Sequence, residues 1–145
     1  MLDLIKSEGH ELVSEHVSGK DVEEIRAIIQ KEFGQAPKEE LARRAWARKN
    51  MIDGIEGDVQ AAIFEVSVPS LGTGVELAHA YLRPRMGLSK IPILALYKKD
   101  YWPNKLSSMV MGITKEEIPQ YTLREYSTTE EAKSHVKEFL QEAEK

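Results

Sequence analysis

Apolar side chains recur every three to four residues along much of the chain, which is the spacing of an amphipathic helix. Gly9 marks the end of a helix in which the chain opens, and Asp21 stands where it can cap the next one. Ser127 and Thr128 are each followed three residues later by a glutamate, which is a capping-box pattern. The spacing predicts helices at residues 21–33, 38–55, 74–82 and 127–145, and a short helical piece at 106–113.

Between these segments lie apolar runs of strand length. "VQAAIFEVSV" (residues 59–68) and "IPILALY" (residues 91–97) are nearly continuous, which is typical of strands covered on both faces. Shorter strands are predicted in "HELVSEHV" (residues 10–17) and "QYTLREY" (residues 120–126). Strands that alternate with helices predict an α/β fold with a mostly parallel sheet between helices, a flavodoxin-like or Rossmann-like three-layer sandwich.

Length and composition narrow this picture. With 145 residues, 41% of them hydrophobic, we expect residues 1–145 to form a single domain. The net charge of -4 gives no general attraction for nucleic acid polymers or anionic membranes. The absence of cysteine excludes disulfides, thiolate metal sites and cysteine nucleophiles. No apolar run approaches the roughly 20 residues that cross a bilayer, so we expect a soluble protein, and the absence of cysteine makes the cytoplasm its expected location.

The stretch "EVSVPSLGTGVELAHA" (residues 65–80) carries the candidate chemistry. Pro69 ends a predicted strand, Gly72 and Gly74 allow backbone N–H groups to approach a ligand, and the helix that follows begins with unpaired N–H donors. Such a helix start binds anions, and the hydroxyls of Ser70 and Thr73 could hold a phosphate or a sugar. The stretch matches neither the P-loop nor the dinucleotide pattern, and an ordinary tight turn is the alternative.

Glu76 in this stretch has two interpretations. Thr73 followed by Glu76 matches the capping box, in which the glutamate binds the backbone of the cap residue. A carboxylate near a helix start at the mouth of a parallel sheet is also kept ionised by the helix dipole, as a nucleophile requires. The pattern alone leaves both open.

The run "FEVSVPSLGTGVELAHA", followed by "IPILALY" and "LSSMVMG", resembles the nucleoside 2-deoxyribosyltransferase family, especially its branch of 2'-deoxynucleoside 5'-monophosphate N-glycosidases. The motifs match in order and spacing, and "SEGHELVSEHV" resembles the family's preceding segment, so the likeness covers nearly the whole chain. It implies that Glu76 is the nucleophile and that Ser70 and Gly72 bind the 5'-phosphate, with Gly74 beside them.

The resemblance implies further site residues and partners. Ser107, in the same motif as Met109, matches a serine that reaches the phosphate from the neighbouring subunit, which implies a homodimer with shared active sites. Met109 is taken as a further substrate-binding candidate, and His16 matches a histidine near the family's active site. The implied ligand is a small nucleotide, and no cofactor is expected.

Two departures from the family pattern stand out. The family begins with a strand and a glycine-bearing loop, whereas Met1 falls inside the helix that follows them, so the sheet is expected to lack the family's first strand. An aspartate that positions the sugar in the family is replaced by Asn50, in "RKNM". Asp53, one turn further on, either substitutes for it or is a solvated helix carboxylate.

The remaining candidates have simpler alternatives. The four histidines lack the spacing of a metal site, so no metal is expected. His79 either touches the substrate or has a simpler place, packed in the fold or facing solvent. Aromatic residues in "YKKDYWPNK" either stack a nucleobase or anchor the loop and a dimer contact: Tyr97, Tyr101 and Trp102.

The predicted function is therefore hydrolysis of the N-glycosidic bond of a (deoxy)nucleoside 5'-monophosphate through a glycosyl-enzyme on Glu76. One alternative is a deoxyribosyltransferase that exchanges bases on free nucleosides. Another is a non-catalytic nucleotide-binding or structural relative.

Overall fold

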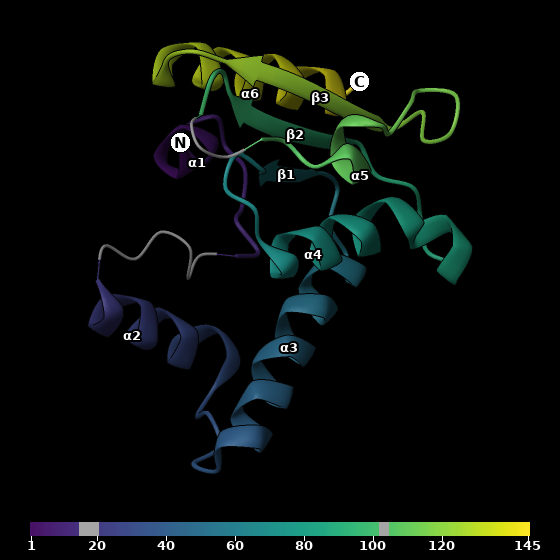
Figure 1. Ribbon diagram of the computed structural model, residues 1–145. Helices are drawn as coiled ribbons and strands as arrows, with labels where there is room; N and C mark the ends of the chain where they lie inside the picture. Colours follow the sequence, from purple (N-terminus) through teal and green to yellow (C-terminus); the bar gives the residue numbers. More distant parts are fainter. Residues whose placement is uncertain (15–20, 102–104) are drawn as a thin grey trace. The chain divides into compact units, whose positions relative to one another are not determined.

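The computed structural model describes residues 1–14, 21–101 and 105–145 (Figure 1). The chain divides into two compact units, Met1–Gly57 and Asp58–Lys145. Within the described residues, no helix combines the length and the apolar character needed to cross a bilayer.

The described secondary structure of the first unit consists of helices. It contains α1 (Leu2–Ser7), α2 (Val22–Phe33) and α3 (Glu40–Glu56). Asp21 caps α2 as predicted, because its carboxylate accepts a hydrogen bond from the Glu24 N–H at 2.8 Å. Glu39 caps α3 in the same way, and the two backbone N–H groups that it binds lower the pKa of its carboxyl group. Phe33 and Trp46 pack edge to face with ring centroids 6.3 Å apart, which joins α2 to α3.

The strand predicted at residues 10–17 is wrong for residues 10–14, which form no strand. The His10 N–H instead donates to the Ile5 carbonyl at 3.2 Å, and Gly9 takes a positive φ of 91°. The backbone of this segment therefore completes the end of α1 rather than pairing with a sheet. The rest of the predicted strand lies outside the described residues.

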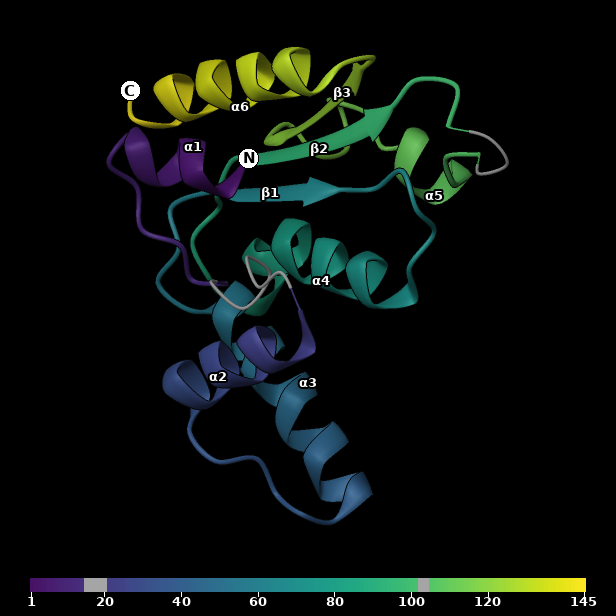
Figure 2. The ribbon, with the colours of Figure 1, turned by 90° about the vertical axis from the view of Figure 1, so that its left-hand side faces the viewer.

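The second unit is an α/β sandwich. Its elements are β1 (Ala62–Glu65), α4 (Leu71–Leu82), the 3-10 helix η2 (Arg83–Met86), β2 (Ile93–Lys98), α5 (Ser108–Met111), β3 (Tyr121–Tyr126) and α6 (Thr129–Ala143). The described strands form a parallel three-stranded sheet in the order β1-β2-β3. Figure 2 shows α4 and α6 on opposite faces of this sheet. The α/β fold with a parallel sheet, flavodoxin-like or Rossmann-like, is thus confirmed.

The apolar core explains why the strand sequences read as continuous hydrophobic runs. β2 is the central strand, and Ile93, Leu94 and Leu96 are almost completely buried because helices cover both faces. Helix α6 packs on β2 and β3 and buries one apolar stripe: Ala132, Val136, Phe139 and Leu140. This packing fixes the sheet that carries the candidate site.

Candidate active site

Two predicted phosphate-binding serines lie at the same end of the sheet. The N-terminal end of α4, capped by Ser70, and the short α5, capped by Ser107, both lie where the strands end (Figure 2). Ligands of parallel α/β sheets bind at the carboxyl ends of the strands. The described strands follow their sequence order, so the change in strand order expected beside the site is not found among them.

Helix α4 begins earlier than the sequence indicated. It starts at Leu71 rather than near Gly74, because the Ser70 Oγ accepts the Thr73 N–H at 3.3 Å. The Gly74 N–H donates to the Ser70 carbonyl at 3.0 Å and closes the first turn. Gly72 and Gly74 therefore belong to the helix and not to a preceding loop.

This start changes the interpretation of Glu76. A capping box requires Thr73 at the N-cap, and Ser70 occupies that place instead. The capping-box alternative is therefore wrong. Glu76 lies in the second turn of α4, half-buried and next to the buried Leu77. Its role as a nucleophile stays a prediction.

The two glycines of α4 have space beside them. A Cβ atom added to Gly74 would have no neighbour within 4 Å among the described residues, and one added to Gly72 would meet only the Ser70 Oγ at 3.8 Å. Neither glycine has a positive φ. Glycine destabilises a helix by roughly 0.5–1 kcal/mol relative to alanine. Among the described residues, neither a positive φ nor a close neighbouring atom requires glycine at either position. Close approach by an outside group is one role that remains for them.

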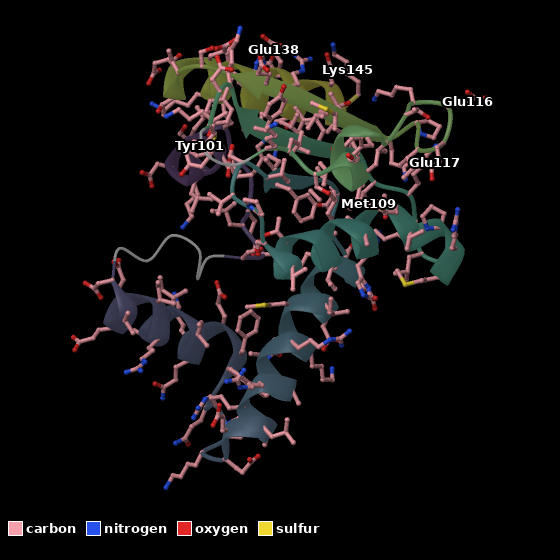
Figure 3. All side chains as sticks on the ribbon, viewed as in Figure 1. Tyr101, Met109, Glu116, Glu117, Glu138 and Lys145 are labelled. Atoms are coloured by element: carbon pink, nitrogen blue, oxygen red, sulfur yellow. The ribbon has the colours of Figure 1, made fainter. Side chains whose placement is uncertain are left out.

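Ser107 repeats the arrangement of Ser70. Its Oγ accepts the Met109 N–H at 3.2 Å at the start of α5. A hydroxyl that accepts in this way keeps its own proton available for donation. Met109 is 81% exposed, and Figure 3 labels its side chain below α5. Its contact with a substrate stays a prediction.

The other predicted site residues lie in the first unit or outside the described residues. On α3, the Asn50 amide donates to the Trp46 carbonyl at 3.0 Å, and Asp53 forms an exposed ion pair with Lys49. Both side chains thus have partners on their own helix. His16 lies outside the described residues.

An apolar groove of about 260 Å³ runs along α4 and η2. Its lining comprises Val75, Ala78, His79, Leu82, Arg85 and Met86. His79 is half-buried in this lining, and its contact with a substrate stays a prediction. Glu76 does not belong to this lining.

The aromatic loop after β2 is only partly described. The Lys98 ammonium lies 6.0 Å from the centroid of the Tyr101 ring, a cation–π distance. Trp102 lies outside the described residues, and stacking of a nucleobase by this loop stays a prediction. The described residues contain no group of three side chains able to hold a metal ion.

A polar cluster at the ends of the strands was missed from the sequence. Glu65, the last residue of β1, accepts hydrogen bonds from the Ser67 hydroxyl and, at 3.1 Å, from the Tyr126 hydroxyl at the end of β3. Ser67 Oγ also accepts the Lys98 N–H at 2.6 Å. Burial, followed by the charge of Glu65, raises the pKa of Tyr126. Glu65 and Ser67 are two positions apart in the sequence, and this spacing indicates that their side chains lie on the same side of the chain where the strand ends.

Comparison with known proteins assigns the family. The chain is 30% identical over 132 residues to a Thermofilum pendens protein named "Putative 2'-deoxynucleoside 5'-phosphate N-hydrolase 1", and the match covers 91% of this chain and 75% of that protein. The chain belongs to this N-hydrolase family. No family model and no solved structure matches it.

Membership in the N-hydrolase family agrees with the resemblance carried by residues 65–80. It supports an enzyme of hydrolase type and gives no test of individual site residues. The roles of these site residues therefore stay predictions: Glu76, Ser70, Gly72, Gly74 and Ser107.

Proposed function

We propose that the protein hydrolyses the N-glycosidic bond of 2'-deoxynucleoside 5'-monophosphates, with Glu76 as the nucleophile. One observation carries the proposal: Ser70 caps α4, which leaves Glu76 a full turn inside the helix and without a capping role. A glutamate at this end of a parallel sheet, in a family named for N-hydrolysis, suits covalent glycosidic chemistry.

The reaction proceeds in two displacements. A carboxylate oxygen of Glu76 bonds to the anomeric carbon as the bond from that carbon to the base nitrogen breaks, and the base leaves with the electron pair and takes up a proton. Water then attacks the same carbon, loses a proton and releases the sugar phosphate from the carboxylate. Both transition states are oxocarbenium-like, and the absence of a 2'-hydroxyl lowers their energy because positive charge on the sugar is better tolerated.

The phosphate is held at the start of α4. Helix geometry leaves the N–H groups of Leu71 and Gly72 without carbonyl partners inside the helix, and the dipole favours negative charge there. The Ser70 hydroxyl adds a donor, and Gly72 and Gly74 leave room for the phosphate. Several donors are needed because a phosphate dianion is strongly hydrated in water.

The active unit in this proposal is a homodimer. Ser107 of one subunit donates to the phosphate bound by its neighbour, and the exposed Met109 beside it contacts the same ligand. Asn50 and Asp53 remain candidates for positioning the sugar, Asp53 as the substitute for the aspartate that Asn50 replaces. No cofactor takes part.

A direct test incubates the purified protein with a panel of deoxynucleoside and ribonucleoside monophosphates and measures the released base by chromatography. We expect release from deoxynucleotides by the unchanged protein and none by Glu76→Gln. Folded protein that releases no base from any member of the panel would overturn the proposal.

A non-catalytic nucleotide-binding protein is the second candidate. It is favoured by Asn50 in place of the family's aspartate and by the ion pair that engages Asp53. Nucleotide binding in calorimetry without turnover, unchanged by Glu76→Gln, would select it. Adding a second free base to the same assay detects a transferase, because exchanged nucleoside would then appear.

A further inference from the structure

One carboxylate ties the two outer strands of the described sheet together. Glu65 at the end of β1 accepts from the Tyr126 hydroxyl at the end of β3, and the two residues are 61 positions apart in sequence. The bond passes over the end of β2, which lies between them. Glu65 also accepts from the Ser67 hydroxyl and, at 3.3 Å, from the Ser67 N–H. Three donors thus converge on this single side chain.

Ser67 is fixed more firmly than an ordinary loop serine. It is buried, its hydroxyl donates to Glu65, and the same oxygen accepts the Lys98 N–H at 2.6 Å. Both capacities of the hydroxyl are therefore used, and an additional role as a nucleophile would break a satisfied buried network. The cluster is better suited to hold the backbone in place.

The segment that follows Ser67 leads directly to the proposed phosphate site. Only Val68 and Pro69 separate Ser67 from Ser70, the cap of α4. The proline ring fixes its own φ and restricts the residue before it to extended conformations. The position of Ser67 therefore largely determines where Ser70 and the first N–H groups of α4 point.

We infer that Glu65 and Tyr126 are positioning residues for phosphate binding. Their bond fixes the exit of β1 at Ser67, and the short rigid segment transmits that position to Ser70 and the start of α4. This inference rests on the proposed function and assigns its phosphate site two residues that do not themselves touch the ligand.

The molecule offers a matched control. Tyr97 on β2 donates to Glu125 on β3 at 2.5 Å, so this is another tyrosine–carboxylate bond near the carboxyl ends of the strands. It joins neighbouring strands, and among the described residues the side chains of Tyr97 and Glu125 form no hydrogen bond with Glu65 or Ser67. Tyr126→Phe and Tyr97→Phe therefore remove the same kind of hydroxyl, and only the first loosens the segment before Ser70.

The first measurement is steady-state kinetics of base release, with inorganic phosphate as a competitive inhibitor. We expect Tyr126→Phe to raise both KM for the nucleotide and the inhibition constant of phosphate about tenfold, with kcat changed less than about threefold. Tyr97→Phe keeps the aromatic ring, and with it any stacking on a base, and removes only the hydroxyl that bonds Glu125, so it should change neither constant. Equal effects of the two variants, or a fall in kcat with both constants unchanged, would overturn the inference.

Amide hydrogen exchange provides a readout that does not depend on activity. We expect exchange in residues 66–73 to become at least about fivefold faster in Tyr126→Phe and to stay unchanged in Tyr97→Phe. Glu65→Gln, which keeps an acceptor oxygen, should fall between Tyr126→Phe and the unchanged protein. If the unchanged protein releases no base, the proposed function fails, and unaltered exchange in Tyr126→Phe would separately overturn the positioning role.

Discussion

Helices α4 and α6 begin near the same four-residue pattern, a threonine followed three positions later by a glutamate, and the two patterns do different things. In α6, the Thr128 hydroxyl oxygen accepts a hydrogen bond from the Glu131 N–H at 3.2 Å. The Glu131 carboxylate in turn accepts one from the Ser127 N–H at 2.7 Å. In α4, Ser70 has taken the cap, so Thr73 lies inside the helix and Glu76 one turn further on. The pattern is a cap only where no earlier hydroxyl occupies the end of the helix.

The difference also changes the charge at each helix start. The first turn of α6 holds Glu130 and Glu131, which compensate its positive dipole end. The first turn of α4 holds no acidic residue, and Leu71 there is 93% exposed. The first turn of α6 thus compensates its own dipole end with carboxylates, whereas the first turn of α4 carries no acidic side chain.

The largest effect is expected from exchanging carboxylate for amide in the two glutamates. Glu76→Gln should lower kcat for base release by about 10³-fold or more, because an amide oxygen is a poor nucleophile. Glu131→Gln keeps an acceptor for the Ser127 N–H and should leave kcat within about twofold. Similar rates for both variants would remove the distinction between a catalytic and a capping glutamate.

A second effect separates the two cap residues. Ser70→Ala and Thr128→Ala should each lower the free energy of unfolding by about 1 kcal/mol, measured by chemical denaturation, because each removes a cap. Only Ser70→Ala should also raise KM for the nucleotide, by about tenfold, through the lost hydroxyl donor. A comparable rise in Thr128→Ala would show that the change in KM reflects general loss of stability.

Replacing Thr73 or Thr128 by alanine tests the free energy of unfolding alone, and the expected difference between the two variants is smaller. Thr128→Ala should destabilise by about 1 kcal/mol, whereas Thr73→Ala should lie within about 0.5 kcal/mol of the unchanged protein, since Thr73 caps nothing and alanine favours a helix interior. Denaturation midpoints of the two variants measure the difference. Equal losses would contradict the placement of the cap at Ser70.

The smallest effect comes from giving α4 the acidic first turn of α6. Leu71→Glu should stabilise the helix by about 0.3–1 kcal/mol through its dipole and should weaken inhibition by phosphate, because the new carboxylate repels the anion. Leu71→Gln is the uncharged control. Stronger inhibition by phosphate in Leu71→Glu would argue against an anion site at this end.

The elements with long periodic patterns were predictable from the sequence. Helices α2 and α6 and strands β1 and β3 fall within the predicted ranges, and α3 and β2 each extend one residue beyond theirs, because their apolar positions report burial directly. The start of α4 was placed too late because glycine disfavours helices, so Gly72 and Gly74 were interpreted as a turn. The competition between Ser70 and Thr73 for the cap depends on backbone geometry that the pattern does not contain.

Long-range contacts were beyond the reach of the pattern. The hydrogen bond from Tyr126 to Glu65 depends on the parallel register, which brings the carboxyl ends of β1 and β3 to the same end of the sheet. The predicted strand at residues 10–14 failed for a related reason, since alternation indicates a strand only where a neighbour is present to pair with it. Of the predicted site, the structure brings Ser70 and Ser107 to one end of the sheet, and Asn50 and Asp53 belong to the other unit.

The cap bonds of Ser70 and Ser107 have a consequence for the entropy of ligand binding. A serine that accepts a backbone N–H has given up rotation about its side-chain bond during folding, and its remaining proton swings only about the C–O axis. An exposed lysine would instead surrender most of its rotamer freedom at the moment of capture. If an anion binds these hydroxyls, the donors are therefore already ordered, and less side-chain conformational entropy is lost on binding.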